Sequence, residues 1–130
     1  MKKDIENRQD IEDFLQAFYE KAFADQLIGY FFTEVVPLDL KTHIPIIAGF
    51  WESIVFNSHG YRKNVMEVHQ HIHDVSKIQK EHLDHWVQLF TETLDTFFEG
   101  PKTELMKQRA KSIATLMDIK LNHDQIKKMG

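Results

Sequence analysis

Apolar residues recur every three or four positions in four stretches of the chain, and this spacing predicts four amphipathic helices. The first is expected from about Asp10, acting as the N-cap, with Tyr19 at one edge of its apolar face. The members of that face are Ile11, Phe14, Leu15, Phe18, Ala22 and Phe23. A break at residues 25–29, a short apolar patch at 30–32 and Pro37 follow.

The second helix is expected to begin near Asp39 to Thr42 and to reach Phe56. Pro45 is tolerable near its start, because the amides of the first turn have no partner within the helix to lose. Its expected inner face consists of Ile47, Phe50, Trp51 and Ile54. His43 lies four residues before Ile47, which places an imidazole on the apolar side.

The third and fourth helices complete an all-α fold, since no stretch alternates as a strand would. The third runs from about Glu81 to the Glu99-Gly100-Pro101 stop, with a stripe of Leu83, Trp86, Val87, Phe90, Leu94, Phe97 and Phe98. The fourth carries Leu105, Met106, Arg109, Ile113, Leu116 and Met117. Residues 58–80 are expected to be irregular, and residues 120–130 form a polar tail that we expect to be frayed.

Length and charge limit the classes of function. The 130 residues are expected to form a single domain, 1–130, with its core at about 10–119. The formal net charge of −4 argues against nucleic acid as a partner, and no apolar run is long enough for a membrane helix. The absence of cysteine excludes disulfides and thiolate ligands and fits a cytoplasmic protein.

Histidine and aromatic residues are unusually frequent, with eight His, ten Phe, three Tyr and two Trp. Three of the histidines, His69, His71 and His73, cluster in the irregular segment and hint at a metal, although a solvated turn is an equal alternative. A zinc hydrolase is disfavoured because Gln70 replaces the Glu of the H-E-x-x-H pattern. Di-iron sites are disfavoured because no Glu-x-x-His or His-x-x-x-Glu pair is present.

Three hydrogen-bonding side chains lie on or beside the apolar faces of different helices: Tyr19, His43 and Trp86. Each alone could be an ordinary core residue whose polar atom finds a backbone partner. Together they bring polar hydrogens towards one interior. With an imidazole from the 69–73 segment, this set is what a haem and its ligand pocket require.

The order of several short motifs resembles the truncated haemoglobins, within them group III, over about residues 11–117. The motifs are Phe18-Tyr19-Glu20-Lys21, Gly29 with Phe31-Phe32, His43 with Phe50-Trp51, Tyr61 with Asn64, His69 with Ile72, Glu81 to Trp86 with Leu89-Phe90, and Gln108-Arg109-Ala110 with Ile113-Ala114. No Gly-Gly pair is present, as in group III.

The resemblance implies a two-over-two helical sandwich that holds haem b, with His69 as the proximal iron ligand. His71 and His73 flank His69 and are its rivals, His73 in particular if the loop is displaced by one turn. It implies Tyr19, His43 and Trp86 as the distal residues. The haem-lining positions that it implies are Phe32, Ile47, Phe50, Trp51, Ile72, Phe90 and Ile113. The four remaining histidines, His59, His82, His85 and His123, are expected to be exposed.

The expected activity is tight, slowly reversible binding of O2 and of other diatomic ligands such as NO and CO, because several donors would face the ligand. The alternative is a haem enzyme that uses O2 or peroxide, as an NO dioxygenase or a peroxidase does, with electrons from a separate reductase. A third hypothesis is a helical interaction module without haem, which would be colourless.

Overall fold

The computed structural model describes residues 2–35, 39–56 and 78–129, the last ten of these by their backbone only. Its elements are α1 (Arg8–Ala24), the short π-helix η1 (Phe31–Val35), α2 (Leu40–Val55), α4 (Lys80–Phe97) and α5 (Pro101–Met129). No strand occurs within these ranges. The all-α prediction is therefore confirmed, and the positions of the four long helices agree with the apolar spacing.

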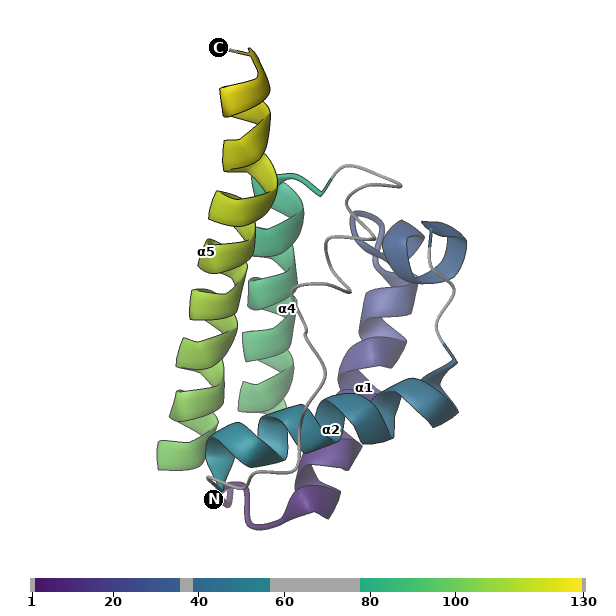
Figure 1. Ribbon diagram of the computed structural model, residues 1–130. Coiled ribbons are helices and arrows are strands. Elements are labelled where there is room, and N and C mark those ends of the chain that lie inside the picture. Colours follow the sequence, from purple (N-terminus) through teal and green to yellow (C-terminus); the bar gives the residue numbers. More distant parts are fainter. Residues whose placement is uncertain (1, 36–38, 57–77, 130) are drawn as a thin grey trace.

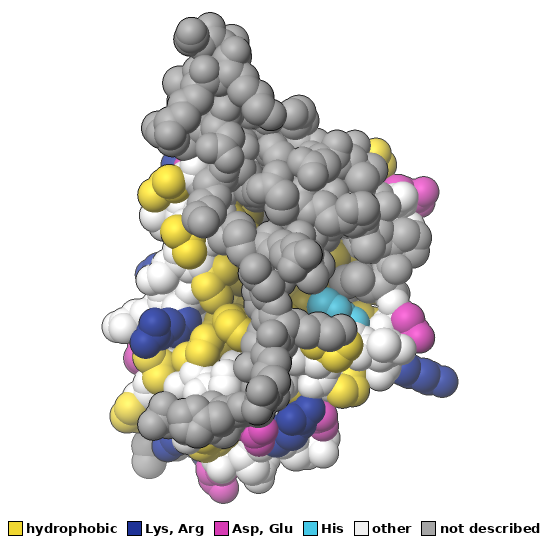
Figure 2. Space-filling view, viewed as in Figure 1, with side chains coloured by type: hydrophobic (Ala, Val, Ile, Leu, Met, Phe, Trp, Pro, Cys, Tyr) yellow, Lys and Arg dark blue, Asp and Glu magenta, His cyan; other side chains and the backbone are white. Residues whose placement is uncertain are grey.

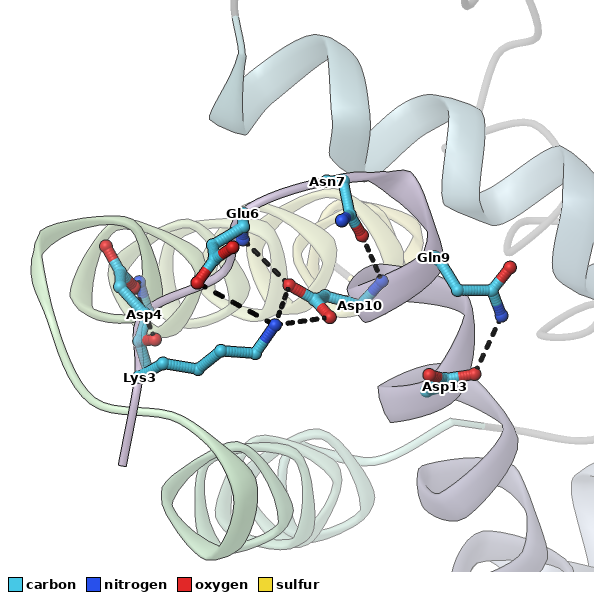
Figure 3. A network of polar contacts seen from close by, with 8 residues as sticks. Lys3, Asp4, Glu6, Asn7, Gln9, Asp10 and Asp13 are labelled. Carbon is cyan, nitrogen blue, oxygen red and sulfur yellow. Dashed lines mark hydrogen bonds and ion pairs between the residues drawn. The ribbon is translucent and has the colours of Figure 1, made fainter. Parts of the chain in front are cut away.

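The start of α1 differs from the prediction. Asn7 is the N-cap, and its side chain accepts a hydrogen bond from the Asp10 amide. Asp10 lies inside the first turn, where its carboxylate accepts bonds from the Glu6 amide at 2.8 Å and from Lys3 Nζ at 2.9 Å (Figure 3). Asp and Asn are equally good caps, so the apolar spacing alone could not separate them.

The residues before α1 form an ordered arm that the sequence analysis did not anticipate. Ile5 is 1% exposed, and the Glu99 amide donates to the Lys3 carbonyl. Asp4 caps α5: its carboxylate accepts bonds from the amides of Lys102 and Thr103, each at 2.9 Å. The N-terminal arm therefore ties the start of α1 to the start of α5.

The connection between α1 and η1 is compact. Asp25 Oδ1 accepts bonds from the amides of Leu27 and Ile28 at 2.8 and 3.0 Å. A Cβ atom on Gly29 would lie 2.6 Å from the Phe23 carbonyl oxygen, so only glycine permits this approach. The predicted break at 25–29 is thus a tight turn against the end of α1.

Helix α2 presents two neighbouring apolar stripes. The buried stripe consists of Ile44, Ala48, Trp51 and Val55, whereas the predicted inner face is correct only for Trp51. Ile47, Phe50 and Ile54 lie one position away and are half-buried. Periodicity finds the apolar side of a helix but does not fix its rotation within about one residue. The half-buried stripe retains apolar surface that the helical core does not fully cover.

The helices form two pairs, α1 with α2 and α4 with α5, which meet through α1–α4 and α2–α5 contacts (Figure 1). This is the predicted two-over-two arrangement. The expected frayed tail is instead a continuation of α5 to Met129, beyond the start of α4. Residues 120–129 contain neither Gly nor Pro, so the polar composition does not stop the helix.

Three residues of the predicted apolar stripes lie on the surface. Phe97 and Leu116 are 46% and 50% exposed, and Arg109 is exposed as well. At the end of α4 it is Phe98, the C-cap, and not Phe97, whose side chain is buried in the core. Within the described residues, no helix has the length and apolar character needed to cross a membrane.

Candidate functional site

A partly buried hydrogen bond joins α1 to α2. Tyr19 Oη lies 2.9 Å from His43 Nε2, and the two rings meet edge to face with centroids 5.1 Å apart. Tyr19 is only 7% exposed, and burial raises the pKa of its hydroxyl above the ordinary value of 10.0. The hydroxyl therefore keeps its proton at any physiological pH.

Aromatic rings surround the Tyr19 ring on several sides. Phe32, from η1, lies edge to face with it at 5.9 Å between centroids, and Phe23 does so at 6.4 Å. Phe18, its neighbour on α1, lies at 5.2 Å. Edge-to-face contacts of this kind hold a ring in place. Tyr19 thus carries its polar atom on a ring that three phenylalanines position.

Trp86 on α4 belongs to the same group of rings. Its centroid lies 6.2 Å from that of Phe18 and 5.2 Å from that of Phe90. Phe90 also contacts Trp51 at 5.1 Å, and Trp51 contacts Phe50 at 5.1 Å. A continuous network of rings therefore connects residues of α2, α4 and α1.

Exposure divides these residues into two sets. Phe90 and Trp51 are 1% and 3% exposed and belong to the packed core. The half-buried set keeps apolar surface that another group could cover: Phe32, Ile47, Phe50, Trp86 and Ile113. Figure 2 shows hydrophobic side chains gathered around a histidine on one face of the molecule. Such a mixture of apolar surface and a few polar atoms is typical of cofactor sites.

Several predicted site residues lie outside the described residues. They are the proposed proximal ligand His69, its rivals His71 and His73, and the lining residue Ile72. His59 lies there too, and His123 is described by its backbone only. In the described part of the chain, no group of three or more His, Cys, Asp or Glu side chains is arranged to hold a metal ion.

Two histidines that were predicted to be exposed have partners instead. His85 Nε2 lies 2.6 Å from Asp25 Oδ2, and both side chains are partly buried. His82 Nδ1 accepts a bond from the Gln79 amide at 2.8 Å, and its ring contacts Phe31. Asp25 and His85 are 60 residues apart in sequence, so no local pattern could pair them.

Comparison with known proteins agrees with this architecture, although no model of a protein family matches the chain. The chain is 25% identical over 118 residues to the group 3 truncated hemoglobin ctb of Campylobacter jejuni, covering 88% of this chain and 91% of the relative. The crystal structure of group III truncated hemoglobin from Campylobacter jejuni superposes with a TM-score of 0.78 at 26% identity. It covers 93% of this chain and 95% of that one. The chain is therefore similar in both sequence and fold to a group III truncated haemoglobin.

A truncated haemoglobin has to offer haem an apolar surface and a polar atom beside it. The half-buried stripe of α2 and the Trp86 ring supply apolar surface of this kind. The Tyr19–His43 pair supplies polar hydrogens close to this surface. The described residues therefore fit the haem that the relationship implies.

Proposed function

We propose that this chain binds haem b with His69 as the proximal ligand, and that it holds a diatomic ligand, O2 foremost, beside Tyr19, His43 and Trp86. The homology to truncated haemoglobins supports a globin-type haem protein. The observation that carries the finer proposal is the partly buried hydrogen bond between Tyr19 Oη and His43 Nε2, set among aromatic rings.

Haem iron held by a neutral imidazole would supply an open coordination position for such a ligand. The tautomer of His43 then decides what Tyr19 can do. If Nε2–H of His43 donates to the Tyr19 oxygen, the hydroxyl hydrogen is left for the ligand. If the hydroxyl donates to Nε2, it cannot serve the ligand at the same time. We propose the first tautomer, in which His43 orients the hydroxyl as a donor.

Trp86 would add an indole N–H from α4, on a ring that Phe18 and Phe90 contact. A diatomic ligand with partial negative charge gains about 1 kcal/mol or more from each such donor. Two donors that together contribute about 2.8 kcal/mol would slow dissociation about a hundredfold. Slow release suits storage or sensing better than delivery.

The lining residues would act by excluding water. We propose that Ile47, Phe50 and Ile113 cover the cofactor together with Phe32, and that Ile72 does so from the segment of His69. Phe90 and Trp51 would support Trp86 and Phe50 from the core. Each hydrogen bond in a site without water is stronger than in solution.

The absorption spectrum of protein purified with haem available tests this proposal. We expect a Soret band that is lost in His69→Ala and retained in His73→Ala, which removes a neighbouring imidazole as a matched control. A colourless unmutated protein would refute haem binding. Loss of the band only in His73→Ala would instead assign the ligand to His73.

The binding function itself is tested by turnover. In the alternative, enzymatic function, NO consumption or peroxide turnover would draw its electrons from a separate reductase. We expect no faster turnover with a reductase than free haemin shows under the same conditions. A rate well above that of haemin would replace binding by an enzymatic function.

A further inference from the structure

One carboxylate on the edge of the molecule binds two parts of the chain at once. Asp25 Oδ1 accepts from the Leu27 and Ile28 amides and closes the turn after α1. Asp25 Oδ2 lies 2.6 Å from Nε2 of His85, on the first turns of α4. One carboxylate oxygen thus binds the turn, and the other binds a helical residue 60 positions later in the chain.

This contact has the character of a charge-assisted hydrogen bond. Burial alone would raise the pKa of Asp25, but the hydrogen bonds from His85 and from the Ile28 and Leu27 amides outweigh it, and the pKa is lowered. Asp25 is therefore ionised at neutral pH. Its side chain is only 16% exposed, so solvent competes weakly for the imidazole N–H.

A second histidine of α4 supports the same connection. His82 lies three residues before His85, and its ring contacts Phe31 at 4.9 Å between centroids. The bond from the Gln79 amide to His82 Nδ1 fixes the orientation of this imidazole. Two histidines on one face of α4 therefore hold the connection at Asp25 and at Phe31.

The α1–η1 connection leads directly to Phe32, which lies beside Tyr19. Phe32 follows Phe31, and its ring lies edge to face with Tyr19 and stacked on Phe23 at 6.0 Å. The close approach of Gly29 to the end of α1 leaves the connection little room to move independently. On the other side, His85 directly precedes Trp86. The Asp25–His85 contact therefore joins the backbone carrying Phe32 to the helical turn carrying Trp86.

We propose that His85 and Asp25 are positioning residues for the ligand pocket: they lock the α1–η1 connection onto α4 and so set the relative placement of Tyr19 and Trp86. Neither residue needs to touch the ligand. This inference rests on the proposed role of Tyr19 and Trp86 as donors.

The test uses the carbon monoxide complex of the haem-containing protein, because the C–O stretching band reports the donors near the ligand. We expect His85→Leu to split or broaden this band and to raise the O2 dissociation rate about fivefold, which corresponds to about 1 kcal/mol. His85→Gln, which can still donate to Asp25, is expected to restore the single band and a rate within about twofold of the original. Asp84→Asn removes the exposed Lys80–Asp84 pair of the same helix and serves as the matched control, with no change expected.

A second variant keeps the test decisive if His85→Leu does not fold. Asp25→Ser retains an oxygen that can cap the turn but cannot reach His85, and we expect the same split band. Faster amide exchange at Leu27 and Ile28 in these variants would report the loosened connection independently of ligand release.

An unchanged band and rate in folded His85→Leu or Asp25→Ser, while Tyr19→Phe still speeds O2 release, would refute the positioning role and leave the proposed function intact. An equal effect of His85→Gln and His85→Leu would also refute it. If Tyr19→Phe has no effect either, the proposed function itself is wrong.

Discussion

Two histidines reach across the same molecule to partners of opposite character. His43 meets the neutral hydroxyl of Tyr19 at 2.9 Å, whereas His85 meets the carboxylate of Asp25 at 2.6 Å. Tyr19 is 7% exposed and surrounded by rings, while the Asp25 side chain lies at the rim with 16% exposure and backbone amides beside it. The environment decides the partner: an ionised group is tolerated only where backbone donors and water can solvate it.

Replacing the neutral partner of His43 by a charged one should have the largest effect on stability. Tyr19→Glu would place a carboxylate among Phe18, Phe23 and Phe32, and we expect it to lower the free energy of unfolding by about 3 kcal/mol or more. Urea denaturation of the haem-containing protein measures this loss, with Tyr19→Phe as the control for the lost ring hydroxyl. A Glu variant as stable as the Phe variant would contradict the contrast between the two environments.

Removing only the hydroxyl should leave the fold and change ligand release. We expect Tyr19→Phe to raise the O2 dissociation rate at least about tenfold, or about 1.4 kcal/mol, because one donor is lost. Stopped-flow displacement of O2 by CO measures the rate. His43→Leu should act in the same direction if His43 orients the hydroxyl, whereas a slower rate in that variant would mean that His43 competes for the hydroxyl hydrogen.

The Asp25–His85 pair at the rim should contribute a smaller free energy to folding than the Tyr19 hydroxyl contributes to holding the ligand. In a double-mutant cycle of His85→Leu and Asp25→Ser, we expect a coupling energy of about 1 kcal/mol in the free energy of unfolding. Urea denaturation of the four proteins supplies the cycle. A coupling energy near zero would show that the short distance does not correspond to a stabilising interaction.

The smallest expected effect is on the pH dependence of stability, which should differ between the Asp25–His85 pair and the Tyr19–His43 pair. The pKa of Asp25 is lowered from 3.8, so its ionised form stabilises the fold at higher pH and this contribution is lost as pH falls through the lowered pKa. Asp25→Asn should therefore flatten the loss of stability between about pH 5 and pH 2. Tyr19→Phe should leave that slope unchanged, since the Tyr19 hydroxyl stays protonated throughout. Equal slopes for all three proteins would remove Asp25 from the acid response.

Much of the fold follows from the sequence because four helices with continuous apolar faces leave few alternatives. The rotation of α2 did not follow, since Ile47 and Ala48 are both apolar and only packing decides which is buried. The ordered arm was missed because Ile5 stands alone among charged residues and shows no periodicity. A single buried side chain carries no pattern.

The approach of Tyr19 to His43 could be anticipated because each lies on the apolar side of its helix. The contacts of His82 with Phe31 and of His85 with Asp25 could not, because both histidines are polar and stand outside the predicted apolar stripe of their helix, so surface exposure was the natural expectation. The Asp25–His85 contact depends on where a turn 60 residues earlier is placed. Long-range polar pairs of this kind are set by the assembled fold and not by local spacing.

The cap that Asp4 places on α5 has a consequence for the order of folding. Its bond to the Thr103 amide closes a loop of 99 residues, so the arm has no docking site until the last helix has formed. The arm should then be the last segment to fold and the first to open locally, well before global unfolding. In the native protein, amide hydrogens at the start of α5 should exchange with solvent through this local opening, whereas those of Phe14 and Phe90 should exchange only through global unfolding.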